Sequence, residues 1–362
     1  MEIRERCITV EIYNAAGNVH SGTNKKGRGS MKKVAIAFLV LAIVMVGAWH
    51  LVGVSIAEPQ KLKVSEVTHS VFYAPQYVAM NLGFFKERNI EIELINSQGA
   101  DKVMTALLSG QVDIGFAGPE AVIYVYLQGK ENYPMVFAQV TKRDGSFLVG
   151  RDMNEEFEWS NLKGKHILPG RKGGVPYMTL EYVIKNNGLN PSEDMNFDNS
   201  ISFDAMTAAF IGGVGDYVTI FEPTATELEL EGKVKILASV GEASGEIPYT
   251  VYFANKDMIA KNPTLIQDFV DALYEGQVWV QEHTDLEVAE VLKESFPGTS
   301  VEVLEKVVAR YRSIDAWNAT PVMSEDAFNR LQDVIEEAGE LDKRVSFEAL
   351  VDNTYAEKAV EK

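Results

Sequence analysis

Cysteine is nearly absent from this sequence, because Cys7 is the only one among 362 residues. A single cysteine excludes an internal disulfide, a CxxC redox motif, a cysteine-rich zinc site and an iron–sulfur cluster. Histidine is also scarce, and the five histidines form no i, i+4 pair and no HExxH motif. We therefore expect no metal site and no cofactor. A Gly-x-Ser-x-Gly elbow for a serine nucleophile is missing as well.

Basic side chains are outnumbered by acidic ones. The sequence has 34 Lys and Arg against 52 Asp and Glu, which gives a formal net charge of −18 at pH 7. A nucleic-acid partner needs a basic face to neutralise phosphates. We therefore expect no nucleic-acid partner.

The remaining composition is that of an ordinary globular protein. Hydrophobic residues make up 46% of the chain and charged residues 24%, which argues against a disordered or fibrous protein. The length suits about two domains, and a core of normal size needs neither a disulfide nor a metal for stability.

Residues 31–57 have the features of a secretory signal peptide. Met31-Lys32-Lys33 is basic, residues 34–54 are almost wholly apolar, and Ser55-Ile56-Ala57 ends the segment with a small-x-Ala pattern. The apolar stretch is also long enough to cross a bilayer as a helix, so an uncleaved N-terminal anchor is the alternative. A lipobox lipoprotein anchor is excluded because no cysteine follows.

Residues 1–30 fit neither reading, because a signal peptide rarely begins thirty residues into a chain. We expect Met31 to be the true start and residues 1–30 to be a mis-assigned upstream extension.

Beyond residue 57 the sequence holds 27 basic and 49 acidic residues, a net charge of −22. An acidic, cysteine-free, exported chain predicts a soluble domain outside the cytoplasm.

The exported part alternates strands and helices, which predicts an α/β fold with mostly parallel sheets. Expected strands lie at residues 62–67, 90–95, 112–116, 135–140, 147–150, 167–168, 197–203, 217–221 and 234–240. Expected helices lie at residues 74–85, 101–108, 118–127, 177–186, 205–210 and 223–231, and further helices follow from residue 263 onward.

Two polar or proline-bearing stretches divide this pattern into two lobes. Residues 58–150 form the first part of lobe 1, residues 151–247 form lobe 2, and residues 248–362 return to lobe 1 as helices. The expected crossings are residues 151–165 and residues 248–254. Two such lobes make a hinged molecule whose ligand cleft lies between them, because ligands of open α/β sheets bind at the carboxyl ends of the strands.

Several motifs resemble a known family. They are Phe72-Tyr73-Ala74-Pro75-Gln76-Tyr77-Val78-Ala79 with Gly83-Phe84-Phe85, Ser109-Gly110-Gln111-Val112-Asp113-Ile114-Gly115, Gly170-Arg171-Lys172-Gly173-Gly174 and Phe221-Glu222-Pro223. The exported chain resembles ABC-importer solute-binding proteins of the nitrate/sulfonate/taurine and thiamine-pyrimidine-precursor group, over about residues 60–340. The resemblance implies a type II periplasmic-binding-protein fold, no catalysis, and delivery of a captured solute to a membrane permease.

Two loops of lobe 1 are candidate ligand contacts. Ser70, Phe72 and Tyr73 follow the first strand, where aromatic rings can stack on a flat ligand and a helix N-terminus offers free N–H groups; alternatively, Phe72 belongs to the core and Tyr73 is a surface cap. Gly118 and Glu120 follow a later strand, where glycine lets a ligand approach the backbone. Glu120 either binds the ligand or only complements the helix dipole. His69, close to the first loop, is expected to be structural, and contact with the ligand is the alternative.

Lobe 2 and its return crossing supply the other candidates. Lys172, Gly173 and Gly174 precede a helix and form a candidate anion cradle, or else a plain glycine-rich turn. Glu222 follows a strand and is expected either to accept hydrogen bonds from a ligand amino group or to cap a helix. Tyr249 lies at the second crossing, where the alternative is hinge packing.

We predict a monomeric solute-binding component of an ABC importer that closes its lobes on a small ligand and is not an enzyme. The first ligand hypothesis is a thiamine pyrimidine precursor or a similar heteroaromatic. A sulfonate, a nitrate-like anion or a flavin is the alternative. Other function classes are a pyrimidine-synthase-like enzyme and a sensor or adhesin outside any importer. The absence of the cysteine-rich iron motif that the fungal enzyme family carries argues against the enzyme.

Overall fold

The computed structural model describes residues 58–362. The expectations for residues 1–57, namely the upstream extension, the signal peptide, the anchor at residues 34–54 and the true start at Met31, lie outside the described residues. From residue 58 onward, no helix combines the length and the apolar character needed to cross a membrane.

A first mixed sheet of five strands forms the core of lobe 1. Its order is β2 (Ile90–Asn96), β1 (Gln60–Glu66), β3 (Ile114–Ala117), β10 (Thr250–Asn255) and β4 (Pro134–Thr141). The strands β1, β2 and β3 are parallel, whereas β10 runs antiparallel to both β3 and β4. The carboxyl ends of β1, β2 and β3 therefore share one edge of the sheet.

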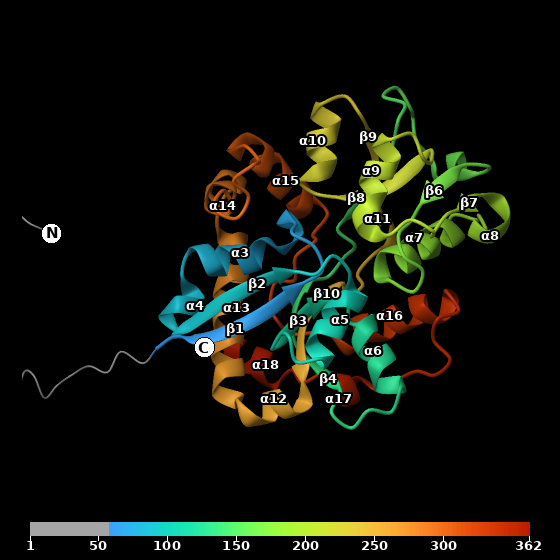
Figure 1. Cartoon of the computed structure of the whole chain (residues 1–362). Coiled ribbons are helices and arrows are strands. Elements are labelled where there is room, and N and C mark those ends of the chain that lie inside the picture. The colour runs from blue at the N-terminus through green and yellow to red at the C-terminus, as the bar shows by residue number, and fades with distance from the viewer. Residues whose placement is uncertain (1–57) are drawn as a thin grey trace, which may run out of the picture. The chain divides into compact units, whose positions relative to one another are not determined.

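A second sheet of five strands forms the core of lobe 2. Its order is β7 (Asn196–Phe197), β6 (His166–Leu168), β8 (Tyr217–Phe221), β5 (Ser146–Gly150) and β9 (Lys235–Ser239). The strands β6, β7 and β8 are parallel, and β5 is antiparallel to both of its neighbours. Figure 1 shows the two sheets and their helices as two lobes, so the predicted two-lobed α/β class is confirmed.

Helices surround both sheets. In lobe 1 and its return they are α3 (Ala74–Asn81), α4 (Phe84–Glu87), α5 (Ala100–Leu108), α6 (Glu120–Leu127), α12 (Lys256–Lys261), α13 (Pro263–Glu282), α14 (Asp285–Leu292), α15 (Val301–Ser313), α16 (Glu325–Glu337), α17 (Phe347–Leu350) and α18 (Thr354–Val360), with the 3₁₀ turn η1 (Val71–Tyr73). In lobe 2 they are α7 (Val175–Asn186), α8 (Pro191–Asp194), α9 (Met206–Ile211), α10 (Thr224–Leu230) and α11 (Val240–Ser244), with the turns η2 (Trp159–Leu162) and η3 (Phe203–Ala205).

Local sequence signals explain where several helices begin. Pro75, Pro176 and Pro263 lie in the first turns of α3, α7 and α13, where a missing N–H costs no helical hydrogen bond. Thr284 and Glu287 form a reciprocal capping box at the start of α14.

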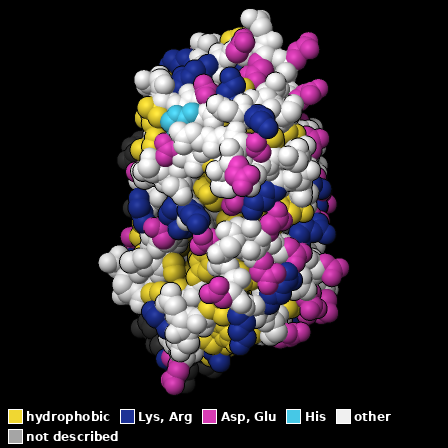
Figure 2. All heavy atoms as spheres, turned by 90° about the vertical axis from the view of Figure 1, so that its right-hand side faces the viewer, with side chains coloured by type: hydrophobic (Ala, Val, Ile, Leu, Met, Phe, Trp, Pro, Cys, Tyr) yellow, Lys and Arg dark blue, Asp and Glu magenta, His cyan; other side chains and the backbone are white. Residues whose placement is uncertain are grey.

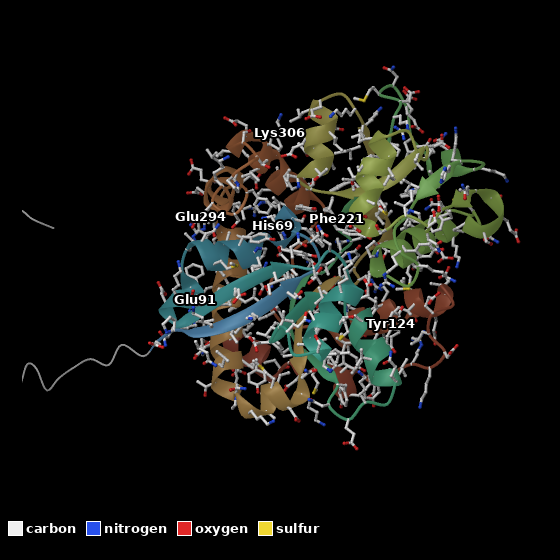
Figure 3. The ribbon with its side chains drawn as sticks, in the orientation of Figure 1. His69, Glu91, Tyr124, Phe221, Glu294 and Lys306 are labelled. Atoms are coloured by element: carbon white, nitrogen blue, oxygen red, sulfur yellow. The ribbon has the colours of Figure 1, made fainter. Side chains whose placement is uncertain are left out.

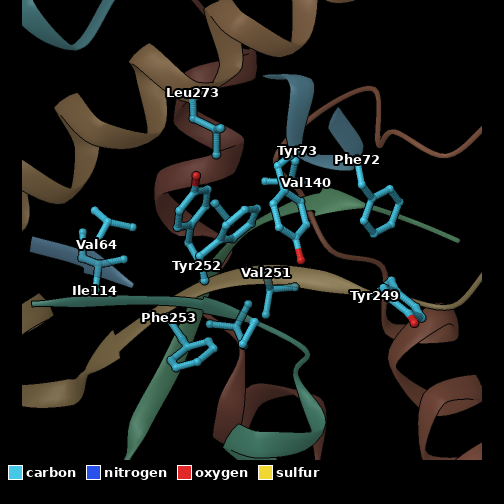
Figure 4. Close-up of a cluster of buried hydrophobic side chains, with 14 of the residues drawn as sticks. Val64, Phe72, Tyr73, Ile114, Val140, Tyr249, Val251, Tyr252, Phe253 and Leu273 are labelled. Carbon is cyan, nitrogen blue, oxygen red and sulfur yellow. The ribbon is translucent and has the colours of Figure 1, made fainter. Parts of the chain in front are cut away.

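Apolar side chains fill both faces of each sheet. In lobe 1, the rings of Phe116 and Tyr252 stack with their centroids 4.2 Å apart, and Figure 4 shows Tyr252 within a cluster of buried side chains. In lobe 2, Leu148 and Val149 belong to separate clusters, because neighbouring residues of a strand point to opposite faces. The face shown in Figure 2 intersperses acidic and basic side chains.

The structure corrects the first crossing. Strand β5 pairs with β8 and β9 of the second sheet, so the chain passes between lobes at residues 142–145 and not at residues 151–165. Lobe 2 thus begins before residue 151. Every residue of β5 is buried, and a strand buried on both faces suits either sheet equally. The second crossing lies near its expected place, because β10 returns to the first sheet.

Two other expected elements are shorter than predicted. The helix expected at residues 74–85 is interrupted at Gly83, whose φ of 87° lies in the left-handed region. The strand expected at residues 197–203 ends at Phe197, and Phe203 instead opens the 3₁₀ turn η3.

Helices of the C-terminal part touch both lobes. Helix α14 packs on α3 of lobe 1, α15 contacts η1 and the lobe 2 helix α10, and α16 contacts the lobe 2 helix α7. The carboxyl-terminal helices therefore link the two lobes in addition to the two crossings.

Candidate functional site

Two adjoining cavities lie between the lobes, and together we call them the interlobe cleft. The first cavity measures about 200 Å³ and is lined by His69 and Ser70 of lobe 1 and by Phe221 and Glu222 of lobe 2, among others. Figure 3 labels His69 and Phe221 near the boundary between the lobes. These residues follow the carboxyl end of β1 or lie at that of β8, which is where α/β sheets bind ligands.

The second cavity measures about 250 Å³. Its wall includes Glu120 after β3 in lobe 1, and Arg171 and Gly174 after β6 in lobe 2. Gln98, Phe203 and Asp204 line both cavities, so the two cavities adjoin each other. These volumes suit a small metabolite and exclude a folded macromolecule.

Ser70 is the lobe 1 residue that links the lobes at the first cavity. Its hydroxyl accepts a hydrogen bond from the backbone N–H of Phe72 (3.2 Å), which caps η1, and donates one to the carbonyl of Glu222 (2.5 Å). Ser70 lines the first cavity, and its role as a ligand contact stays a prediction.

Phe72 and Tyr73 lie behind the cleft wall and line neither cavity. The Phe72 ring is wholly buried, with its centroid 5.3 to 5.8 Å from those of Tyr311, Tyr249 and Phe221. The structure therefore places Phe72 in the core, which was the alternative reading. Tyr73 is buried as well, not exposed as a cap, because its ring packs on Phe116.

Glu120 begins α6, is only 1% exposed, and contributes to the second cavity. Its Oε2 atom is buried and accepts no hydrogen bond from any residue of the described chain. Burial raises the pKa of Glu120 to about 7, against the opposing effects of the Arg171 charge and of the backbone N–H groups of Glu120, Val175 and Ala121. Gly118 lies directly beside this carboxyl group, since an added Cβ would be 2.0 Å from Oε2.

Two residues of the glycine-rich loop before α7 bind other groups of the protein. Lys172 forms an ion pair with Glu340 (3.2 Å) and lines neither cavity. The carbonyl of Gly173 accepts a hydrogen bond from the Tyr124 hydroxyl (3.0 Å). Gly174 is the N-cap of α7 and does line the second cavity, together with Arg171.

Both carboxylate oxygens of Glu222 are bound by neighbouring protein groups. It accepts hydrogen bonds from the backbone N–H and the hydroxyl of Thr226 (2.8 Å each) and forms an ion pair with Arg310 (2.6 Å). Burial raises the pKa of Glu222, and the Arg310 charge opposes that rise. The Glu222 carboxylate therefore caps the start of helix α10, which is the alternative role given above. Glu222 nevertheless also borders the first cavity.

Tyr249 lies at the second crossing, buried beside Phe72, and lines neither cavity. The nearby carboxyl of Asp144 accepts hydrogen bonds from the backbone N–H and hydroxyl of Ser146 (2.7 and 2.6 Å). Burial raises the pKa of Asp144 to about 7 and that of Tyr249 well above its ordinary value. These two residues therefore pack the crossings, which favours the hinge alternative for Tyr249.

His69 is both structural and exposed to the first cavity. Its Nδ1 atom lies 3.0 Å from the Glu66 carboxylate and its Nε2 atom 2.9 Å from the Ser295 carbonyl. The hydroxyl of Tyr77 also lies 3.0 Å from Nδ1, and the hydrogen bond to Glu66 raises the pKa of His69 against the opposing effect of burial. The imidazole of His69 thus borders the first cavity.

Sequence reasoning missed the three residues that line both cavities. The sequence pattern predicts Phe203 at the end of a strand and Asp204 in the connection after it, although Asn199-Ser200 shortly before them is a turn-forming pair. Gln98 follows β2 and has a φ of 58°, and the motifs give no signal for it.

Glu120 gives a pH dependence of stability that can be measured. Its carboxyl ionises near pH 4.5 when unfolded and near pH 7 when folded, so the native state loses stability as the pH rises between these values. Glu120→Gln removes this loss, and we expect the variant to be about 3 kcal/mol more stable than the wild type at pH 8 and equally stable near pH 4. Urea titrations at both pH values measure the difference.

The exposed Glu361→Gln is the matched control, and it should leave the difference between pH 4 and pH 8 unchanged. A Glu120→Gln variant that is less stable than the wild type at pH 8 would show that the ionised carboxylate is stabilised in the fold, contrary to this expectation.

The family model described as "NMT1/THI5 like" matches residues 71–285. YtlA of Bacillus subtilis, which is named as a binding protein, is 41% identical over 298 residues, covering 82% of this chain and 89% of YtlA. The 4-amino-5-hydroxymethyl-2-methylpyrimidine phosphate synthase of Aspergillus parasiticus is 25% identical over 219 residues, covering 56% of this chain and 61% of the synthase.

The fold also has solved counterparts. The alkanesulfonate-binding protein SsuA from Xanthomonas axonopodis superposes with a TM-score of 0.67 at 20% identity, covering 82% of this chain and 99% of SsuA. This similarity confirms the periplasmic-binding-protein fold that the motifs implied. Since the family model matches residues 71–285, which is more than half of the sequence, the chain belongs to the NMT1/THI5-like family.

Proposed function

We propose that this protein is the extracytoplasmic solute-binding component of an ABC importer. The observation that carries the proposal is the interlobe cleft, whose two cavities are each lined by residues of both lobes. A solute that contacts both lobes stabilises the closed arrangement over an open one, because only the closed arrangement makes all its contacts. Closure then creates the surface that a permease recognises.

The similarity to YtlA supports a binding function. The similarity to the fungal synthase is lower and covers less of either chain. We therefore propose a monomeric binding protein, held outside the cytoplasm, and no enzyme.

The proposed ligand is a small, flat, amino-bearing heteroaromatic such as a thiamine pyrimidine precursor. The second cavity supports it with the apolar side chains of Val67, Pro176 and Phe203 around one buried carboxyl group. The alternatives are a sulfonate, a nitrate-like anion and a flavin.

Thermal unfolding with added solutes tests the proposal. The panel is 4-amino-5-hydroxymethyl-2-methylpyrimidine, taurine, nitrate and riboflavin, each far above the expected dissociation constant. We expect one of them to raise the melting temperature, because a ligand that binds only the folded state stabilises it by mass action. Phe203→Ala should remove the shift, since Phe203 lines both cavities.

Leu230→Ala is the control, because Leu230 is exposed on α10 and lines neither cavity. A solute that still shifts the melting temperature of Phe203→Ala by the full amount would be bound elsewhere and would contradict the proposed site.

A further inference from the structure

The second cavity contains a buried acceptor that the protein leaves without a donor. Glu120 comes from the first turn of α6 in lobe 1, and its Oε2 atom accepts no hydrogen bond within the described chain although it is buried. An ionised carboxylate that is removed from water is unfavourable unless a donor or a cation accompanies it. The cavity beside it is large enough for such a group.

The same carboxyl group faces the N-terminus of α7 in lobe 2. The backbone N–H of Val175, the first residue of α7, is among the groups that oppose the rise in the pKa of Glu120. The protein's own acid thus lies where the glycine-rich loop was expected to cradle an anion. A sulfonate or a nitrate placed there would meet Glu120 at close range, and like charges in a cavity of low polarity repel each other.

The other charged residues of the second cavity do not make it favourable for an anion. Its lining includes three acids, Asp101, Glu120 and Asp204, and two basic residues, Lys102 and Arg171. The Arg171 guanidinium lies 3.5 Å from the carboxylate of Asp101, which partly neutralises the positive charge of Arg171. The cavity therefore carries at least as much negative as positive charge.

Gly118 sets the position of the Glu120 carboxyl group. A Cβ atom at residue 118 would lie 2.0 Å from Oε2 and 2.8 Å from the carboxyl carbon. Any larger residue at this position would displace the carboxyl group. The sequence Gly118-Pro119-Glu120 thus keeps the buried acid against the cavity.

We propose that Glu120 binds an N–H group of the transported solute and makes the cleft selective for a flat nitrogen base over an oxyanion. This inference rests on the proposed function and specifies its ligand. An amino group or a protonated ring nitrogen donates to Oε2, and the apolar wall of Val67, Pro176 and Phe203 packs on the ring. Such a charge-assisted hydrogen bond is stronger than one between neutral groups.

Calorimetric titration with two probes tests the proposal on the wild type, Glu120→Gln and Gly118→Ala. The probes are 4-amino-5-hydroxymethyl-2-methylpyrimidine and taurine. The wild type should bind the aminopyrimidine and not taurine, and Glu120→Gln should weaken aminopyrimidine binding about 10- to 100-fold. Gly118→Ala should weaken it as well, since it displaces the carboxyl group and leaves the charge in place.

A second readout separates ligand binding from a structural role. Glu120→Ala frees the N-terminus of α7, so this variant should gain affinity for taurine, which damage to the fold would not cause. Glu340→Gln is the matched control, because Glu340 pairs with Lys172 outside both cavities.

Three results would overturn the proposal: unchanged aminopyrimidine binding by Glu120→Gln, wild-type taurine binding at least as tight as that of the aminopyrimidine, or no binding of the aminopyrimidine at all. In the last case solute capture itself still stands if another member of the panel gives a melting shift that Phe203→Ala removes. If no member of the panel does so, the proposed function fails too.

Discussion

Replacing Arg310 by methionine is expected to lower the free energy of unfolding by about 3–5 kcal/mol. Arg310 extends from α15 and binds Glu222 (2.6 Å), Thr226 (3.0 Å) and Glu229 (3.2 Å) at the start of α10 and along it. The Glu222 carboxylate is fully buried and Arg310 is its ion-pair partner. Without Arg310, a charge remains in the interior with no countercharge. Urea unfolding at pH 7 measures the loss.

The matched control is Arg344→Met. Arg344 forms ion pairs with Asp333 and Glu336, but all three side chains are exposed by 40% or more. An exposed pair contributes at most about 1 kcal/mol, because water and salt screen it. Equal losses in the two variants would mean that the burial of Glu222 does not govern the strength of this link between α15 and lobe 2.

Replacing Gly241 by alanine should destabilise the protein by about 3 kcal/mol, the upper part of the range for overpacking. Gly241 lies in α11, and a Cβ there would be 2.1 Å from the carbonyl oxygen and 2.9 Å from the nitrogen of Asp144. Both are backbone atoms of the first crossing between lobes, so no side-chain rotation relieves the overlap. Either the crossing or α11 must move. Urea unfolding gives the loss.

Gly298→Ala provides the comparison for this alanine substitution. Gly298 is exposed, and an added Cβ has nothing within 4 Å. Its substitution should change stability by less than about 0.5 kcal/mol. If Gly241→Ala were equally harmless, the close packing of α11 against the crossing would not be a feature of the protein in solution.

Local sequence patterns predict where most helices and strands lie. They do not predict to which lobe each element belongs. The strand expected at residues 217–221 coincides with β8, because an apolar run is bounded by turn residues on one side and by Glu222-Pro223 on the other. Strand β5 was equally clear as a strand and was placed in the wrong sheet. Sheet membership depends on partners such as β9, which lies more than eighty residues later, and no local pattern encodes that pairing.

The two candidate acids show the same limit at the site. Glu120 and Glu222 both follow a buried strand and precede or begin a helix next to a proline, and their surroundings in the sequence are alike. The structure distinguishes them, because Arg310 and Thr226 bind Glu222 while the Oε2 atom of Glu120 has no donor in the described chain. The difference comes from a residue 88 positions away, so a single sequence could nominate both acids but could not choose between them.

The crystal structure of this chain with the solute that gives the largest melting shift is the most direct test of solute capture between two lobes. We predict that the solute lies in the interlobe cleft and contacts Glu120 of lobe 1 and Phe203 of lobe 2, both of which line the second cavity. A solute bound to one lobe alone, or in the separate groove lined by Arg88 and Trp279, would contradict it.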